Sequence, residues 1–199
     1  MEDTCNAEPV ERISDLTTMV GFQLRFNPLM LKIKELLSDG AIGDILSVRA
    51  EVCEYMPWFH RYEDYRETYA SKKSLGGGVV LTQIHEIDFL IDLFGFPNSV
   101  FAIGGKKSHL EIDVEDNAYA LMKTSEGVVA TLHSSATQWH HRFSLEINLE
   151  KGSVNLNGIL SGTKSYGEET MAVISADPDN DFGRPVEKRY TYNYDPSWE

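Results

Sequence analysis

The stretch that decides the fold is residues 75–95, LGGGVVLTQIHEIDFLIDLFG. Three consecutive glycines come early in it, and because glycine carries no Cβ, the backbone there can turn tightly and approach another surface closely. The residues after them recur at helical spacing, and this pattern stops at Gly95 with Pro97 just beyond, as is typical of a helix terminus. We therefore predict a glycine turn that leads into a helix.

The predicted helix carries a narrow polar stripe beside a broad apolar face. At about 100° per residue, His85, Asp88 and Asp92 fall together, while isoleucines, leucines and phenylalanines cover most of the remaining surface. A histidine with carboxylates one and two turns along a mostly buried helix is a candidate proton-transfer site. The alternative is a core histidine that a carboxylate satisfies, with no role beyond packing.

The glycine-to-helix pattern resembles the second domain of the Gfo/Idh/MocA oxidoreductases, which act on sugars, inositols and sugar derivatives. Residues 20–28, VGFQLRFNP, resemble the segment where the chain of that family leaves its nucleotide-binding domain. Residues 64–69, DYRETY, resemble a branch that acts on sugar acids or sugar nucleotides, and residues 146–153 resemble a late strand turn. The likeness spans residues 18–160, and its most specific part is the block from the glycines to His85.

The resemblance implies a reaction and a set of site residues. Family members transfer a hydride between a sugar carbinol carbon and NAD or NADP, and a base takes the hydroxyl proton. By resemblance His85 is that base, and Asp88 on the same helix is expected to set its tautomer. Many members carry an aspartate where this chain has Thr82, which can hydrogen-bond a substrate but cannot act as a base near neutral pH. The expected substrate contacts are Arg25, Asn27, Trp58, Tyr65, Arg66 and Thr82. Arg66 is expected to pair with an anionic group of the substrate.

Two motifs of the family are missing from this sequence. It contains no strand–GxGxxG–helix unit, which would bind a dinucleotide, and no Glu-Lys-Pro motif, whose lysine lies beside the reacting hydroxyl in the family. We therefore expect a fragment or isolated domain, the substrate-binding and oligomerisation half of an oxidoreductase. It should be inactive alone and bind neither NAD nor NADP tightly by itself. The alternative is a non-catalytic sugar-binding or dimerisation module that kept the sheet and lost the chemistry.

The remaining pattern predicts an α+β fold, an open and mostly antiparallel β-sheet with helices packed on one face. Residues 1–16 lack a period and should form an irregular segment ahead of one domain at 17–199. A second helix is predicted at 28–38, because Pro28 suits a first helical position and Gly40 a stop. Strands are predicted at 16–26, 45–55, 99–105, 117–123, 127–136, 143–149, 153–157, 171–175 and 187–192. No helix is expected after Tyr194.

Two aromatic segments are candidates for binding. Residues 57–73 combine tryptophan, tyrosine and arginine, and aromatic faces suit the C–H faces of sugars; the alternative is an amphipathic lid helix that packs on its own sheet. Residues 139–142, WHHR, lie at a predicted strand edge, where adjacent histidines point to opposite faces and make a poor chelate. We therefore predict no metal site, and a substrate or interface role for this segment. By resemblance, the free sheet face pairs copies into a homodimer or tetramer.

Composition excludes several classes of protein. The formal net charge of −13 over 199 residues argues against nucleic acid, whose phosphates require a basic surface. No apolar run reaches the roughly 18 residues of a membrane helix, and the N-terminus lacks the basic and apolar regions of a signal peptide. Cys5 and Cys53 are too few for a disulfide framework or a zinc cluster. A cytoplasmic protein with a small-molecule ligand is the expectation.

Overall fold

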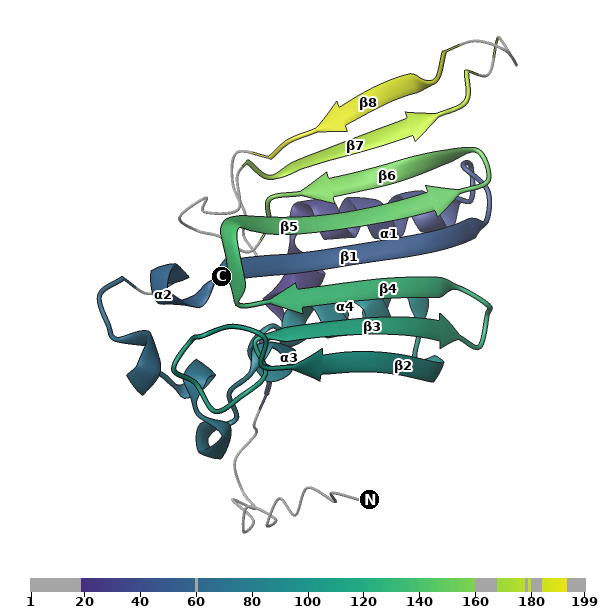
Figure 1. Ribbon diagram of the computed structural model, residues 1–199. Helices are drawn as coiled ribbons and strands as arrows, with labels where there is room; N and C mark the ends of the chain where they lie inside the picture. The colour runs from purple at the N-terminus through teal and green to yellow at the C-terminus, as the bar shows by residue number, and fades with distance from the viewer. Residues whose placement is uncertain (1–18, 60, 160–167, 178, 180–183, 193–199) are drawn as a thin grey trace.

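The computed structural model describes residues 19–59, 61–159, 168–177, 179 and 184–192. A single eight-stranded sheet forms one layer, and α1 (Pro28–Asp39) and α4 (Ile84–Phe94) lie side by side behind it (Figure 1). The strand order is β2-β3-β4-β1-β5-β6-β7-β8, and every neighbouring pair is antiparallel except β1 and β4. The predicted α+β class, with an open, mostly antiparallel sheet and helices on one face, is confirmed.

Most of the predicted strands outside residues 16–26 lie within one or two residues of the observed ones, but β5 begins six residues before its predicted start and so includes residues 139–142. The strands are β1 (Ile45–Tyr55), β2 (Pro97–Gly105), β3 (Asn117–Thr124), β4 (Val129–Ser135), β5 (Thr137–Leu149), β6 (Gly152–Asn157), β7 (Thr170–Ser175) and β8 (Val186–Tyr190). Two short α-helices, α2 (Met56–Phe59) and α3 (Val79–Thr82), and four 3-10 helices, η1 (Gln23–Phe26), η2 (Tyr65–Glu67), η3 (Tyr69–Ser71) and η4 (Lys73–Leu75), complete the described elements. None of the described helices has the length and hydrophobicity that a bilayer crossing requires.

The strand predicted at residues 16–26 is wrong where the structure describes it. Residues 23–26 form η1 instead, and the next residue, Asn27, caps α1 by accepting hydrogen bonds from the backbone N–H groups of Leu29 and Met30. Leu24 is buried in the core while Phe26 is exposed, although residues two apart in a strand would share one face. The segment contacts α1 and α4 rather than a sheet edge, so it has no neighbouring strand to pair with.

The glycine triplet makes the tight turn that its sequence predicts, but the helix after it is broken. A Cβ on Gly77 would lie 2.5 Å from the carbonyl oxygen of Tyr69, and Gly78 has a φ of 101°, so neither position suits another residue. The chain then forms α3, leaves helical geometry at Gln83 (φ −103°, ψ 35°), and resumes as α4. This break turns His85 and its neighbours toward the end of β1, which matters for the site below.

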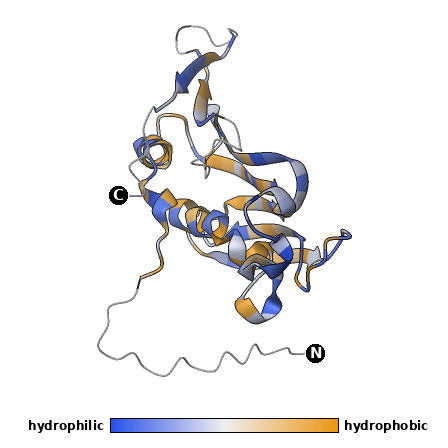
Figure 2. Cartoon of the chain, turned by 90° about the vertical axis from the view of Figure 1, so that its left-hand side faces the viewer, coloured by the Kyte–Doolittle hydropathy of each residue, from blue (hydrophilic) through white to orange (hydrophobic). Residues whose placement is uncertain are grey.

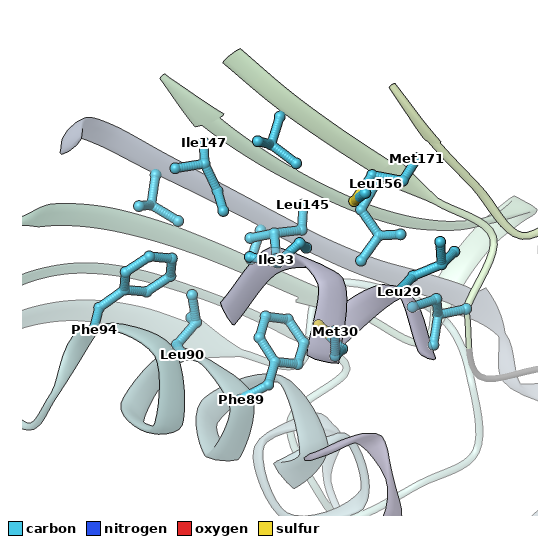
Figure 3. Packing of buried hydrophobic residues seen from close by; sticks show 14 of the residues in the cluster. Leu29, Met30, Ile33, Phe89, Leu90, Phe94, Leu145, Ile147, Leu156 and Met171 are labelled. Carbon is cyan, nitrogen blue, oxygen red and sulfur yellow. The ribbon is translucent and has the colours of Figure 1, made fainter. Parts of the chain in front are cut away.

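The core lies between the two long helices and the sheet. Leu29 and Ile33 from α1, and Phe89 from α4, are all at most 1% exposed. They pack against strand residues such as Leu145 and Met171 (Figure 3). Each such side chain contributes about 1.5–3 kcal/mol by leaving water. Figure 2 shows the corresponding amphipathic character, since both helices carry hydrophobic and hydrophilic residues.

The opposite face of the sheet carries an apolar patch over β2 and β3. Phe101 pairs with Leu121 and Ile103 with Tyr119, so the four side chains lie on one face, and all four are exposed. Their neighbours Ala120 and Met122 pack against the core, which places this open-face patch away from the helices.

Candidate functional site

A pocket of about 300 Å³ opens at the C-terminal end of β1, beside the start of α4. Strand β1 ends where the chain turns into α2, and the loop with η2 and η3 folds back over the same place, held by the glycine turn. We call this the β1–α4 pocket. Its lining residues are Gln23, Val52, Glu54, Met56, Phe59, Tyr65, Thr68, Tyr69, Ala70, Thr82, Gln83, His85 and Glu86.

Three of the eight predicted site residues line this pocket. They are Tyr65, Thr82 and His85, from η2, α3 and α4 respectively. The Thr82 hydroxyl donates to the carbonyl oxygen of Gly78 at 2.8 Å, which leaves its lone pairs as acceptors for a ligand. The Tyr65 hydroxyl accepts a hydrogen bond from the backbone N–H of Glu111 at 3.2 Å, so its own proton remains available to donate.

His85 is a neutral, partly buried imidazole at the pocket wall. Burial lowers its pKa below the ordinary value of 6.5, and the nearby Asp88 opposes this shift less strongly. Its Nδ1 is buried and has no hydrogen-bond partner among the described residues. The ring meets Phe22 edge-on at a centroid distance of 6.2 Å. An uncharged imidazole has one unprotonated nitrogen and can therefore accept a proton.

Asp88, which was expected from the sequence to set the tautomer of His85, is hydrogen-bonded to Arg25 and not to the imidazole. Its carboxylate accepts two hydrogen bonds from Arg25, from Nε at 2.9 Å and from Nη2 at 2.5 Å. One turn further, Asp92 lies 2.6 Å from Nζ of Lys34 and 3.8 Å from Nη1 of Arg25. A cationic fork binds a carboxylate more strongly than a neutral ring does. The polar stripe therefore fastens η1 and α1 to α4, and neither Arg25 nor Asp88 lines the pocket.

Asn27 and Arg66 also have partners within the chain. Asn27 is completely buried, and its side-chain oxygen caps α1. Arg66 donates to Asp64 through Nε and Nη2 and to Glu111 through Nη1 at 2.9 Å, and the ion pair lowers the pKa of Asp64 to about 2. Both residues lie outside the pocket wall. The guanidinium that was expected to meet an anionic substrate is engaged by two carboxylates.

Trp58 belongs to an aromatic cluster at the rim rather than to the pocket. Its ring meets Tyr55 and Trp139 edge-on at 5.6 and 5.0 Å, and these two stack on each other at 4.2 Å. The cluster joins α2 to β5 and brings together both aromatic segments singled out in the sequence. Residues 57–59 and 61–73 include the end of α2 and the short 3-10 helices η2, η3 and η4, not the continuous lid helix of the alternative interpretation.

The pocket contains two carboxyl groups that the sequence interpretation missed, Glu54 of β1 and Glu86 of α4. Glu86 is fully buried, and neither of its carboxyl oxygens has a hydrogen-bond partner among the described residues. Burial, reinforced by the charge of Glu54, raises the pKa of Glu86 well above 4.5. The sequence signal that could have identified Glu86 is its position on the helix. At about 100° per residue, it falls between Phe89 and Leu90, inside the apolar sector.

The raised pKa of Glu86 predicts a pH-dependent stability. A carboxyl whose pKa is higher in the folded than in the unfolded chain stabilises the fold fully below about pH 4.5, and this contribution is lost as the pH rises toward its folded pKa. Relative to Glu86→Gln, wild-type protein should therefore lose up to about 1.4 kcal/mol of unfolding free energy per pH unit in that window. Urea unfolding between about pH 5 and pH 8 measures this slope.

Glu126, exposed in the turn between β3 and β4, provides the matched control. Glu126→Gln removes the same formal charge and should keep the wild-type slope. Equal slopes for wild type and Glu86→Gln would show that Glu86 is ionised in the folded chain at an ordinary pH.

Comparison with known proteins places this geometry in a family. Residues 30–155, more than half of the chain, match the family described as GFO/IDH/MocA C-terminal domain. The 2,7-anhydro-N-acetylneuraminate hydratase of Escherichia coli is 27% identical over 161 residues, which are 78% of this chain and 42% of that protein. The chain thus spans less than half of the length of this curated relative.

Two solved structures show the same fold. Levoglucosan dehydrogenase in complex with NADH and L-sorbose superposes with a TM-score of 0.70 at 21% identity, covering 92% of this chain and 50% of that one. The WlbA dehydrogenase of Bordetella pertussis, in complex with NADH and UDP-GlcNAcA, gives 0.59 at 23% identity, covering 69% and 39%. With the sequence match over residues 30–155, these findings show that the chain belongs to the GFO/IDH/MocA family and contains its C-terminal domain.

Proposed function

We propose that this chain is the substrate-binding half of an NAD- or NADP-dependent oxidoreductase that acts on a sugar or sugar derivative. The observation that carries the proposal is the neutral His85 at the wall of a pocket that also presents Tyr65 and Thr82. A volume of about 300 Å³ suits a small ligand. The relatives support the substrate class, because their names refer to an anhydro sugar acid, levoglucosan and a sugar nucleotide.

The residues of this chain do not fit a dinucleotide. The pocket is too small for one, and the described residues include no glycine-rich turn between a strand and a helix that could bind a pyrophosphate. In the proposal, the nicotinamide therefore belongs to another part of a longer protein. The part that falls to this chain is acid–base chemistry: His85 accepts the proton of the substrate hydroxyl, while Tyr65 and Thr82 orient the sugar.

A non-catalytic sugar-binding or dimerisation module is the second candidate. The observation that favours it is the partnership of Asp88 with Arg25, which leaves His85 without a hydrogen-bonded carboxylate to stabilise its imidazolium. Such a module would keep the pocket and the sheet face but transfer no proton. Both candidates bind a sugar. Only in the oxidoreductase half does His85 take part in a reaction.

Because the proposal assigns sugar binding to this chain and nicotinamide binding to another part of the protein, the purified chain should bind sugars without oxidising them. Sugars should perturb the backbone amide signals of residues 82–86 in NMR spectra, while NAD or NADP added with the same sugars should give no reduced nicotinamide. His85→Asn should weaken sugar binding by about tenfold, the value of one buried hydrogen bond. His109→Asn, an exposed histidine outside the pocket, is the control. Nicotinamide reduction by the purified chain would contradict this division, and unperturbed amides would contradict the proposed function itself.

We also propose that the open-face patch pairs two copies of the chain into a homodimer or tetramer. Four exposed apolar side chains on one flat sheet face resemble an interface more than a solvated surface. Leu121→Glu should give a monomer in sedimentation velocity, because a charge would be buried at the interface. Leu31, also 47% exposed but on α1, gives the matched control Leu31→Glu, which should stay oligomeric. A monomeric wild type at every concentration would contradict the proposal.

A further inference from the structure

Glu86 differs from the other buried carboxyl groups of the described chain whose partners are defined. Asp116 is 0% exposed and accepts hydrogen bonds from the N–H groups of Lys107 and Ser108 and from the hydroxyl of Ser108. Asp88 is 7% exposed and is held by Arg25. Glu86 is 0% exposed, and no other described residue donates to either of its oxygens. Because a buried polar group without a partner is costly, an unpaired Glu86 requires a reason.

The position of Glu86 supplies one. It lines the β1–α4 pocket next to His85, and Glu54 enters the same pocket from β1. Both carboxyl-bearing side chains line this one pocket, and the charge of Glu54 opposes the ionisation of Glu86. The described residues that line the pocket include no lysine or arginine, and apolar side chains such as Val52 and Met56 make up much of the remaining wall.

We propose that Glu86, with Glu54 beside it, is the ligand-binding group that makes this pocket select an uncharged, hydroxyl-bearing sugar and reject a sugar acid. This inference rests on the proposed function and names the substrate class of that same site. A sugar hydroxyl both donates and accepts, so it can satisfy the two oxygens that lack partners. A carboxylate on the ligand would instead lose its hydration in this pocket without meeting a lysine or arginine among the described lining residues.

The protonation of Glu86 supports the same selection. Burial raises its pKa, so the group keeps a proton above the pH at which an exposed glutamate loses it. A neutral carboxyl can donate one hydrogen bond and accept others, and it costs less to bury than an ion. The inference differs from the expectation of an anionic substrate. That expectation depended on Arg66, whose guanidinium is bound by Asp64 and Glu111 outside the pocket.

The experiment compares matched sugars on the purified chain by NMR titration. The probes are glucose and galactose, the corresponding uronates, and the corresponding uronamides, which keep the size of a uronate without its charge. Wild-type protein should bind each hexose and uronamide at least about tenfold more tightly than the uronate. Uronates that bind as tightly as the hexoses would overturn the inference and leave the proposed function standing. Absence of binding by every sugar would overturn both.

Two variants separate the role of Glu86 from its packing. Glu86→Met replaces the carboxyl by an apolar chain of similar length, so it should fold and yet bind hexoses about tenfold more weakly. Glu86→Gln keeps a donor and an acceptor and should restore binding to within about threefold of wild type. Thermal unfolding verifies the fold of each variant, and Glu126→Gln is the remote control. Unchanged hexose affinity in a folded Glu86→Met would overturn the inference.

Discussion

The pairing of β1 on both of its edges is the constraint on which the rest of the structure depends. Parallel to β4 and antiparallel to β5, this strand joins two antiparallel groups, β2 to β4 and β5 to β8, that share no other neighbour in the sheet. Parallel neighbours need a long crossover, and here the chain between β1 and β4 contains the aromatic loop, α3, α4 and the β2–β3 hairpin. The site therefore lies on the crossover connection that the parallel pairing of β1 and β4 requires.

The position of the β1–α4 pocket is determined by where β1 ends. Val52 and Glu54 form its floor, α2 starts directly after, and the glycine turn returns the loop to the same edge. The start of α4 is held there by Arg25, which ties η1 to Asp88 through two charge-assisted hydrogen bonds. Asp88 and Asp92 of the polar stripe thus hold η1 and α1 against α4, and neither accepts a hydrogen bond from His85. The pocket in turn contains the one buried glutamate whose oxygens the described chain leaves without donors.

Periodicity was sufficient to predict most of this fold. The bounds of β1 and α1 follow from alternation and from the proline and glycine at the ends of the helix, because these signals are local. The strand expected at 16–26 failed because a short amphipathic segment has the same pattern whether it pairs with a strand or packs on a helix. Identifying the site required tertiary contacts. Nothing in the sequence shows that Arg25 reaches Asp88 or that Glu111 reaches Arg66, since these partners lie 63 and 45 residues apart in the chain. The irregular segment expected at 1–16 and the end after Tyr194 lie outside the described residues.

The central claim is that the pocket keeps His85 uncharged, with a nitrogen ready to take a proton. The most direct test is an NMR titration of its imidazole in the folded chain, with His85→Asn to assign the signal. The account predicts a pKa below 6.5, because burial outweighs the charge of Asp88. It also predicts that Arg25→Ala raises this value, since Asp88 would then act on the ring without its cation. A wild-type pKa at or above 6.5 would contradict the account.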